Sequence, residues 1–277
     1  MKLQTIVDII SSKWKIGYED KILMLGSCFS DEIGAQMQQR NLHVTCNPFG
    51  TLYNPLSIAN AINLQSSISN LQLVYHDGLW HSMSHHGSFS RADKEEAEVA
   101  VADSIKTMQQ ALQEATVIIV TFGTAWVYEL DGEVVGNCHK LPESCFTRRR
   151  LCVDEIVAAW KPIIERYPDK HWIFTVSPIR HIKDGLHENQ ISKATLLLAL
   201  EAISSQYSVV SYFPSYEIML DELRDYRFYA DDLVHPSSLA VSYIWERFVD
   251  TFCTPQTKNE LVLQHKRWKH EHHIPLH

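Results

Sequence analysis

The sequence predicts a three-layer α/β/α sandwich around a mainly parallel sheet of five strands. Two observations carry this prediction: short apolar runs alternate with longer segments of helical period, and each run ends at a turn or loop signal. Such alternation is typical of α/β proteins, in which helices cover both faces of a parallel sheet. The 277 residues suffice for one domain with a substantial core.

The predicted strands share a high content of Ile, Val, Leu and aromatic residues, as buried parallel strands do. They cover residues 22–25, 42–46, 117–122, 172–176 and 208–212.

The predicted helices repeat apolar residues every three or four positions. Phe29, Ile33 and Met37 lie on one face of a helix just past the first strand. In the segment 153–167, Pro162 is expected to kink or end the helix. The remaining helices are expected over residues 97–112, 191–203 and 239–248.

Two segments, 75–90 and 129–152, break the alternation and are expected to be insertions over one end of the sheet. Asp131-Gly132 predicts a hairpin in the second. We expect a single domain over residues 1–253. The polar, His-rich residues 254–277 lack a periodic pattern and are expected to form an extended or disordered tail rather than a metal site.

Composition excludes several classes of protein. The net charge of −8 argues against a nucleic-acid partner. The basic run 148–150 is short and is better interpreted as a solvated loop than as a site for a phosphate or an acidic ligand. No apolar run approaches the roughly 20 residues of a membrane span, and no secretory signal is evident. Six cysteines without a C-x-x-C motif favour a reducing, cytoplasmic location. Nothing indicates the oligomeric state.

The first strand leads through Gly26 and Ser27 to Cys28 at the start of the first helix. Residues after such a strand lie at the carboxyl edge of the sheet, where ligands bind in open α/β folds. The helix N-terminus is expected to lower the pKa of a cysteine placed there from its free value of about 8.5. The alternative is that Cys28 is a small buried apolar side chain.

Near the C-terminus, Asp232 precedes His235 by three positions, just before the last amphipathic helix. An aspartate in this position can accept a hydrogen bond from Nδ1 of the imidazole and leave Nε2 free to take a proton from a nucleophile. The alternative is that Asp232 and Ser237 merely cap the helix.

Six motifs in chain order resemble the GSCFA-domain family, which is placed by similarity in the SGNH (GDSL-like) hydrolase superfamily. The resemblance extends from about residue 21 to 252. The motifs are Gly26-Ser27-Cys28-Phe29-Ser30, Asn47-Pro48-Phe49-Gly50-Thr51-Leu52-Tyr53-Asn54-Pro55, Phe122-Gly123-Thr124-Ala125-Trp126, Asn137-Cys138-His139-Lys140, Ser177-Pro178-Ile179-Arg180-His181 and Asp232-Leu233-Val234-His235.

The resemblance implies a flavodoxin-like fold and a hydrolase site at the carboxyl edge of the sheet. In the superfamily the first motif is Gly-Asp-Ser, so Cys28 aligns with the nucleophile, with Ser27 as the alternative after a one-residue shift. His235 would be the general base and Asp232 its partner. Gly50 aligns with the glycine whose N–H joins the oxyanion hole.

The third superfamily motif, Gly-x-Asn-Asp, lacks its asparagine here, because the chain has Gly123-Thr124-Ala125-Trp126. Losing one oxyanion donor typically costs about 10²–10³ in turnover. Thr124 or Asn137 could replace it. Asn54 is a weaker substrate-binding candidate. Arg180 could bind a substrate carboxylate or phosphate, or could simply pair with Asp184.

The predicted function is hydrolysis of a small polar or carbohydrate-linked ester, or transfer of its acyl group, with no cofactor. The alternative is a non-catalytic module that binds a glycan or metabolite. A third interpretation is a metal-dependent hydrolase that uses His81, His85 and His86, although their spacing fits no common zinc motif.

Overall fold

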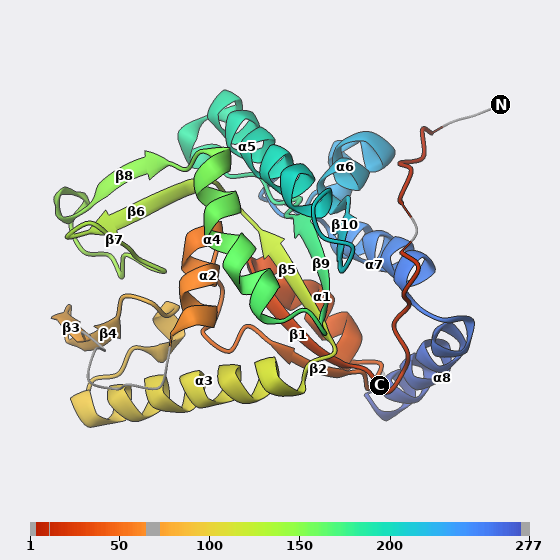
Figure 1. The fold of residues 1–277 in the computed structure, drawn as a ribbon, viewed down its shortest axis with the longest axis horizontal. Helices are drawn as coiled ribbons and strands as arrows, with labels where there is room; N and C mark the ends of the chain where they lie inside the picture. Colours follow the sequence, from red (N-terminus) through yellow and green to blue (C-terminus); the bar gives the residue numbers. More distant parts are fainter. Residues whose placement is uncertain (1–3, 11, 65–72, 273–277) are drawn as a thin grey trace, which may run out of the picture.

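A parallel five-stranded sheet with the order β10-β9-β5-β1-β2 forms the centre of the computed structural model, which describes residues 4–10, 12–64 and 73–272 (Figure 1). All four pairs of neighbouring strands are parallel. The five predicted strands are confirmed, with ends within two residues of those expected. They are β1 (Lys21–Gly26), β2 (His43–Cys46), β5 (Val117–Phe122), β9 (His171–Val176) and β10 (Val210–Phe213).

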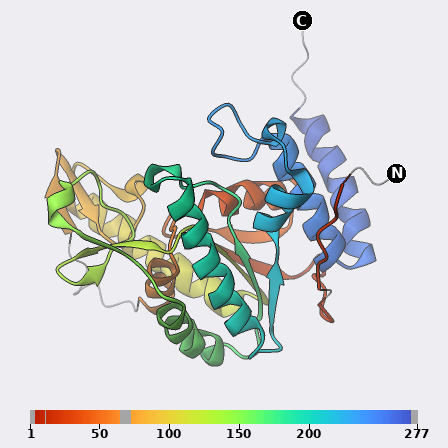
Figure 2. The same ribbon diagram turned by 90° about the horizontal axis from the view of Figure 1, so that it is seen from above.

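Helices cover both faces of this sheet, which confirms the three-layer α/β/α sandwich (Figures 1 and 2). Their bounds are α1 (Cys28–Gln38), α2 (Pro55–Asn63), α3 (Lys94–Glu114), α4 (Val153–Arg166), α5 (Leu186–Ser204), α6 (Ser215–Glu217), α7 (Ser238–Phe252) and α8 (Pro255–Glu271). Short 3-10 or π turns cover Gly87–Phe89, Glu143–Cys145, Ile182–Asp184, Ile218–Leu223 and Tyr226–Phe228.

The two faces of β1 contribute to two separate cores, because successive side chains of a strand point to opposite sides. Leu23 and Leu25 pack in the core formed with α2, α3, α4 and α5. Ile22 and Met24 pack in the core formed with α1 and α7. The continuous apolar runs of the central strands follow from this burial on both sides.

Two helices differ from the sequence expectations. Helix α4 continues past Pro162 to Arg166. Helix α2 was not predicted, although its start carries a recognisable signal: Asn54 accepts a hydrogen bond from the N–H of Ser57, and Pro55 occupies the first turn.

The expectation of an extended or disordered C-terminal tail is wrong for the described residues up to 272, because Pro255–Glu271 form helix α8. Thr254 caps the helix, and Thr257 and Leu261 are buried. The hydroxyl of Thr257 donates to the carbonyl of Ile16. Because few apolar side chains of α8 contact the rest of the chain, its apolar residues do not repeat with a clear helical period. Residues 273–277 lie outside the described part of the chain.

Both insertions form small antiparallel sheets. In the first, β3 (Leu73–His76) pairs with β4 (Leu79–Ser82). In the second, β6 (Trp126–Leu130) pairs with β7 (Glu133–Val134) and β8 (Thr147–Arg150). Asp131 and Gly132 both have positive φ, as the predicted tight hairpin requires. The N–H of Gly136 donates to the carbonyl of Met83 and joins the two insertions, which lie together in Figure 1.

The basic run was expected to be a solvated loop, which is wrong because it forms strand β8. Each arginine has an acidic partner. Arg148 pairs with Asp184, Arg149 with Glu129 and Glu155, and Arg150 with Glu188.

None of the helices within the described ranges has the length and apolar character that crossing a membrane requires.

Candidate active site

The turn between β1 and α1 places Cys28 at the carboxyl edge of the sheet. Gly26 has φ 134°, and a Cβ there would lie 2.2 Å from the carbonyl oxygen of Thr121 on β5. Only glycine fits this approach. Asn47 supports the turn, since its Oδ1 accepts from the N–H of Gly26 at 2.8 Å and its Nδ2 donates to Asp31 at 2.7 Å. Helix α1 then begins at Cys28.

The loop before α7 holds Asp232 and His235 in contact. Oδ2 of Asp232 lies 2.6 Å from Nδ1 of His235. Oδ1 accepts the backbone N–H groups of Val234 and His235 at 2.9 and 3.0 Å. These hydrogen bonds hold the pKa of Asp232 at about 2. The carboxylate therefore stays ionised at neutral pH. Ser237, not Asp232, caps α7.

Cys28, His235 and Asp232 form a row of contacting side chains, because Sγ of Cys28 lies 3.8 Å from Nε2 of His235. The pKa of the thiol is raised, and burial is the largest cause. The backbone N–H groups of Cys28 and Phe29 act in the opposite direction. The expectation of a lowered pKa is therefore wrong: the helix N-terminus stabilises the thiolate, but loss of solvation outweighs it.

Ser27, the alternative nucleophile, is enclosed. Its side chain is only 1% exposed, and Oγ has no hydrogen-bond partner within the described ranges. Of the two candidates, Cys28 is the one in contact with His235.

A cavity of about 540 Å³ opens in front of Cys28 and His235. Four predicted substrate-binding residues line it, namely Asn54, Thr124, Asn137 and Arg180. Gly50 does not, and its N–H donates to the carbonyl of Asn47 at 2.7 Å. The structure does not support the expected oxyanion role of Gly50, because the turn at Asn47 already uses this donor.

The polar groups of the cavity differ in the hydrogen bonds that they have left to make. Both polar atoms of the Asn54 side chain bond to Ser57. The hydroxyl of Thr124 bonds to Ser192 at 3.1 Å and accepts from the N–H of Trp126. Asn137 uses Oδ1 to accept from the N–H of His139. Its Nδ2 makes no hydrogen bond to any residue that the structure describes.

Arg180 supports the loop that carries Asp232 and His235. Its Nη1 donates to the carbonyl of Leu233 at 3.0 Å, and its guanidinium lies over the rings of Tyr226 and Tyr229. The alternative pairing of Arg180 with Asp184 is not found, since Asp184 pairs with Arg148 at 2.6 Å.

Sequence reasoning missed two basic side chains at the cavity, namely Lys193, which is buried and is not part of the lining, and His181, which lines the cavity. Nζ of Lys193 donates to the carbonyls of Gly123 and Ser177 at 2.6 and 2.8 Å, and burial lowers its pKa to about 7. Burial also lowers the pKa of His181, to about 3. The position of Lys193 on the apolar face of α5, in helical register with Leu196 and Leu200, could have indicated its burial.

The histidines considered as metal ligands instead support the first insertion. His81 bonds through both ring nitrogens, to Ser90 and to the carbonyl of His76. His85 lies between the hydroxyls of Ser82 and Ser104, at 2.8 Å from each. Within the described part of the chain, no three His, Cys, Asp or Glu side chains are grouped as a metal site would require.

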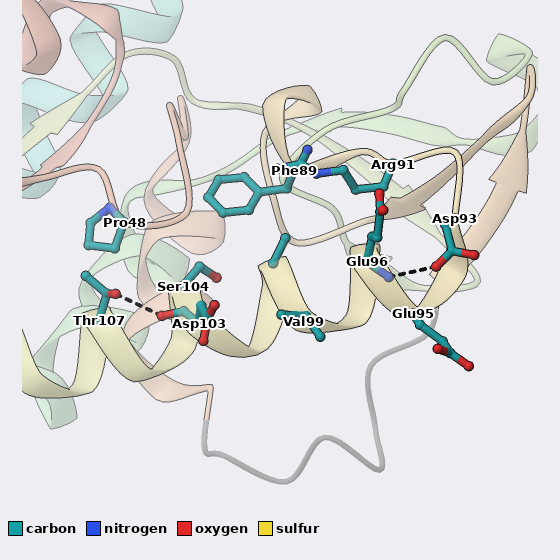
Figure 3. A pocket seen from close by; sticks show the side chains of 11 residues that line it. Pro48, Phe89, Arg91, Asp93, Glu95, Glu96, Val99, Asp103, Ser104 and Thr107 are labelled. Atoms are coloured by element: carbon teal, nitrogen blue, oxygen red, sulfur yellow. Dashed lines mark hydrogen bonds between the residues drawn. The ribbon is translucent and has the colours of Figure 1, made fainter.

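A larger and more open cavity, of about 900 Å³, lies along α3 (Figure 3). Its polar groups are engaged in local structure: Asp93 caps α3 through the N–H of Glu96, and Thr107 donates to the carbonyl of Asp103. None of the residues that line it is a cysteine. Its serine, Ser104, lies 2.8 Å from Nε2 of His85, but Nδ1 of that histidine bonds to the hydroxyl of Ser82 and not to a carboxylate.

The fold and the site together define an α/β protein that presents a Cys-His-Asp row at the carboxyl edge of a parallel sheet. Residues 21–248 match the GSCFA family, and the chain belongs to this family. The comparison with curated proteins yields no match.

Proposed function

We propose that the protein is a thiol-dependent hydrolase of the SGNH type that cleaves a small ester or transfers its acyl group. One observation carries the proposal: Sγ of Cys28, both ring nitrogens of His235 and the carboxylate of Asp232 form a continuous row of contacts that faces a cavity. A nucleophile, a base and a group that orients the base are the parts that acyl transfer needs.

The reaction begins when Sγ of Cys28 attacks the acyl carbonyl while Nε2 of His235 takes the thiol proton. The raised pKa of Cys28 favours proton transfer during the attack over a preformed thiolate. His235 then gives the proton to the departing alcohol, which leaves a thioester on Cys28. Water attacks this thioester with His235 as base, and the acid and the free thiol are released. A second alcohol in place of water gives acyl transfer.

The developing oxyanion would accept from the N–H of Cys28, which lies in the first turn of α1 and lacks an intrahelical acceptor. Nδ2 of Asn137, the unengaged amide of the cavity, is the second proposed donor. It comes from the insertion and takes over from the missing asparagine. Thr124 is less suited, since its hydroxyl is already engaged with Ser192 and Trp126.

Turnover of p-nitrophenyl acetate by the wild type and by Cys28→Ala, Ser27→Ala and His235→Ala tests the proposal. We expect Cys28→Ala and His235→Ala to lose turnover, and we expect an acetyl thioester on Cys28 in the intact mass of the wild type. Retained turnover in Cys28→Ala would refute the thiol mechanism. Loss confined to Ser27→Ala and His235→Ala would make Ser27 the nucleophile.

A non-catalytic binding module is the second candidate, and the engaged N–H of Gly50 favours it, because a reduced oxyanion hole slows acyl transfer. In that case no variant would change turnover. Iodoacetamide labelling of native Cys28 would still be slowed by a bound ligand.

A further inference from the structure

Cationic side chains outnumber carboxylates in the lining of the cavity in front of Cys28, in contrast to the chain as a whole. The lining holds three cationic side chains, Arg148, Arg180 and Lys183, and a single carboxylate, Asp184. The chain carries a net charge of −8. The larger cavity along α3 shows the opposite balance, because Asp93, Glu95, Glu96 and Asp103 line it with one arginine (Figure 3).

Arg148 is the lining cation with the most defined position. Its guanidinium lies 4.2 Å from the ring centre of Trp126 and 5.2 Å from that of Tyr128. Nη2 is 2.6 Å from Asp184, and the side chain is 31% exposed. Stacking and pairing hold the planar group in place, which reduces the entropy cost of binding a ligand.

Most of the N–H groups of this guanidinium remain available. An arginine has five N–H donors, and among the residues that the structure describes, Asp184 is the one acceptor that Arg148 contacts. Arg180 already donates a hydrogen bond from Nη1 to the carbonyl of Leu233. Lys183 is largely exposed and lies 3.4 Å from Glu143 at the surface. Unused guanidinium donors in a partly enclosed cavity match the oxygens of carboxylates and phosphates.

We propose that the substrate carries an anionic group, a carboxylate or a phosphate, that binds to Arg148 while Cys28 attacks the ester. Arg180 and Lys183 add positive potential. The identity of the reaction rests on the proposed function. The anion site does not, because it can be tested by alkylation of the Cys28 thiol alone.

The test compares alkylation of Cys28 by iodoacetate and by iodoacetamide, with peptide mapping. Both reagents form the same S–C bond and release iodide, but only iodoacetate is anionic. The ratio of the two rates cancels the fraction of thiolate, so it reports the local field rather than the pKa. We expect a ratio at least about 10-fold higher at Cys28 than at the exposed Cys145, falling with added NaCl.

Arg148→Gln is expected to lower the ratio at Cys28 to that of Cys145, and Arg148→Lys to retain part of the difference. Arg150→Gln is the matched control: Arg150 lies on the same strand and is also ion-paired, with Glu188, but it does not line the cavity. An equal ratio in the wild type and Arg148→Gln, or an equal fall in Arg150→Gln, would overturn the proposal.

Protection of Cys28 against iodoacetamide by small anions identifies the chemical class of the anionic group. Benzoate and phenyl phosphate are compared as inhibitors of iodoacetamide labelling, and the better protector identifies a carboxylate or a phosphate ligand. Protection by neither would overturn the proposal.

Ester turnover separates this proposal from the proposed function. If phenyl acetate and 4-acetoxybenzoate are cleaved equally well, the anion site fails and the hydrolase stands. If neither is cleaved but the alkylation ratio depends on Arg148, the hydrolase fails and the anion site stands.

Discussion

Sγ of Cys28 lies 3.8 Å from Nε2 of His235, although the two residues are 207 positions apart in the chain. One stands at the start of α1 and the other in the loop before α7, and α1 and α7 pack in the same core on one face of the sheet. That core thus determines the spacing between thiol and imidazole. Asp232 lies 2.6 Å from Nδ1 of the same histidine.

Asp232→Asn should lower kcat by about 10²–10⁴ and leave the fold intact. The amide oxygen can still accept the N–H groups of Val234 and His235. The amide cannot, however, hold the imidazole in the required tautomer or stabilise its charged form. Steady-state kinetics together with thermal melting measure both effects. Asp231→Asn, a change in the same exposed loop, is the control. A wild-type rate in Asp232→Asn would remove the aspartate from the mechanism.

The alkylation of Cys28 by iodoacetamide should rise mainly in the alkaline range. Burial raises the pKa of this thiol, so its thiolate forms above the ordinary value of about 8.5. Rates measured from pH 6 to pH 10 with peptide mapping give the apparent pKa. Exposed Cys145 in the same digest is the reference. An inflection at Cys28 below that of Cys145 would contradict the prediction.

Stability should fall as the pH decreases from about 6.5 towards 3. Burial lowers the pKa of His85 and of His181 to about 3, whereas a histidine in the unfolded chain titrates near 6.5. Between these values the unfolded state binds more protons, and each histidine costs about 1.4 kcal/mol per pH unit.

Urea unfolding at pH 7, 6 and 5 measures this dependence. In His85→Gln the pH dependence should be shallower, whatever the stability at pH 7, because one of the histidines whose pKa burial lowers is gone. Exposed His187→Gln should keep the slope of the wild type. The same slope in His85→Gln would mean that His85 does not resist protonation.

Gly26→Ala should destabilise the protein by more than about 3 kcal/mol, because it combines unfavourable backbone geometry with a backbone clash. A Cβ would lie 2.2 Å from the carbonyl oxygen of Thr121, and φ is 134°. Gly132→Ala shares a positive φ but meets no atom within 4 Å. Its expected cost is about 1 kcal/mol. Equal melting temperatures for the two variants would contradict this account.

The five strands and five of the helices, α1, α3, α4, α5 and α7, could be predicted from the sequence alone. Segments such as Val117–Phe122 are buried on both faces, so burial leaves a continuous apolar run that is visible without coordinates. Asp232 and His235 could also be paired, since their contact spans one short loop. Helix α8 escaped prediction because few of its residues contact the rest of the chain.

The candidate site depended more on tertiary structure. Cys28 is favoured over Ser27 because its side chain lines the cavity. The sequence does not show which of two neighbouring residues in a motif points its side chain toward a cavity. The N–H of Gly50 donates to the carbonyl of Asn47 within a turn, a contact that the sequence did not reveal. The solvation of the Cys28 thiol depends on the residues packed around it. Their packing raises its pKa, whereas the sequence predicted a lowered one.

The sequence by itself therefore determined the layered fold, the family-like motifs and the types of side chain available for chemistry, because each of these depends on local order along the chain. Only the tertiary structure decided that Cys28 contacts His235 and that Arg148 from an insertion lines their cavity. Contact, burial and unused hydrogen-bond donors depend on residues far apart in sequence, and these are set by how the helices and insertions pack around the sheet.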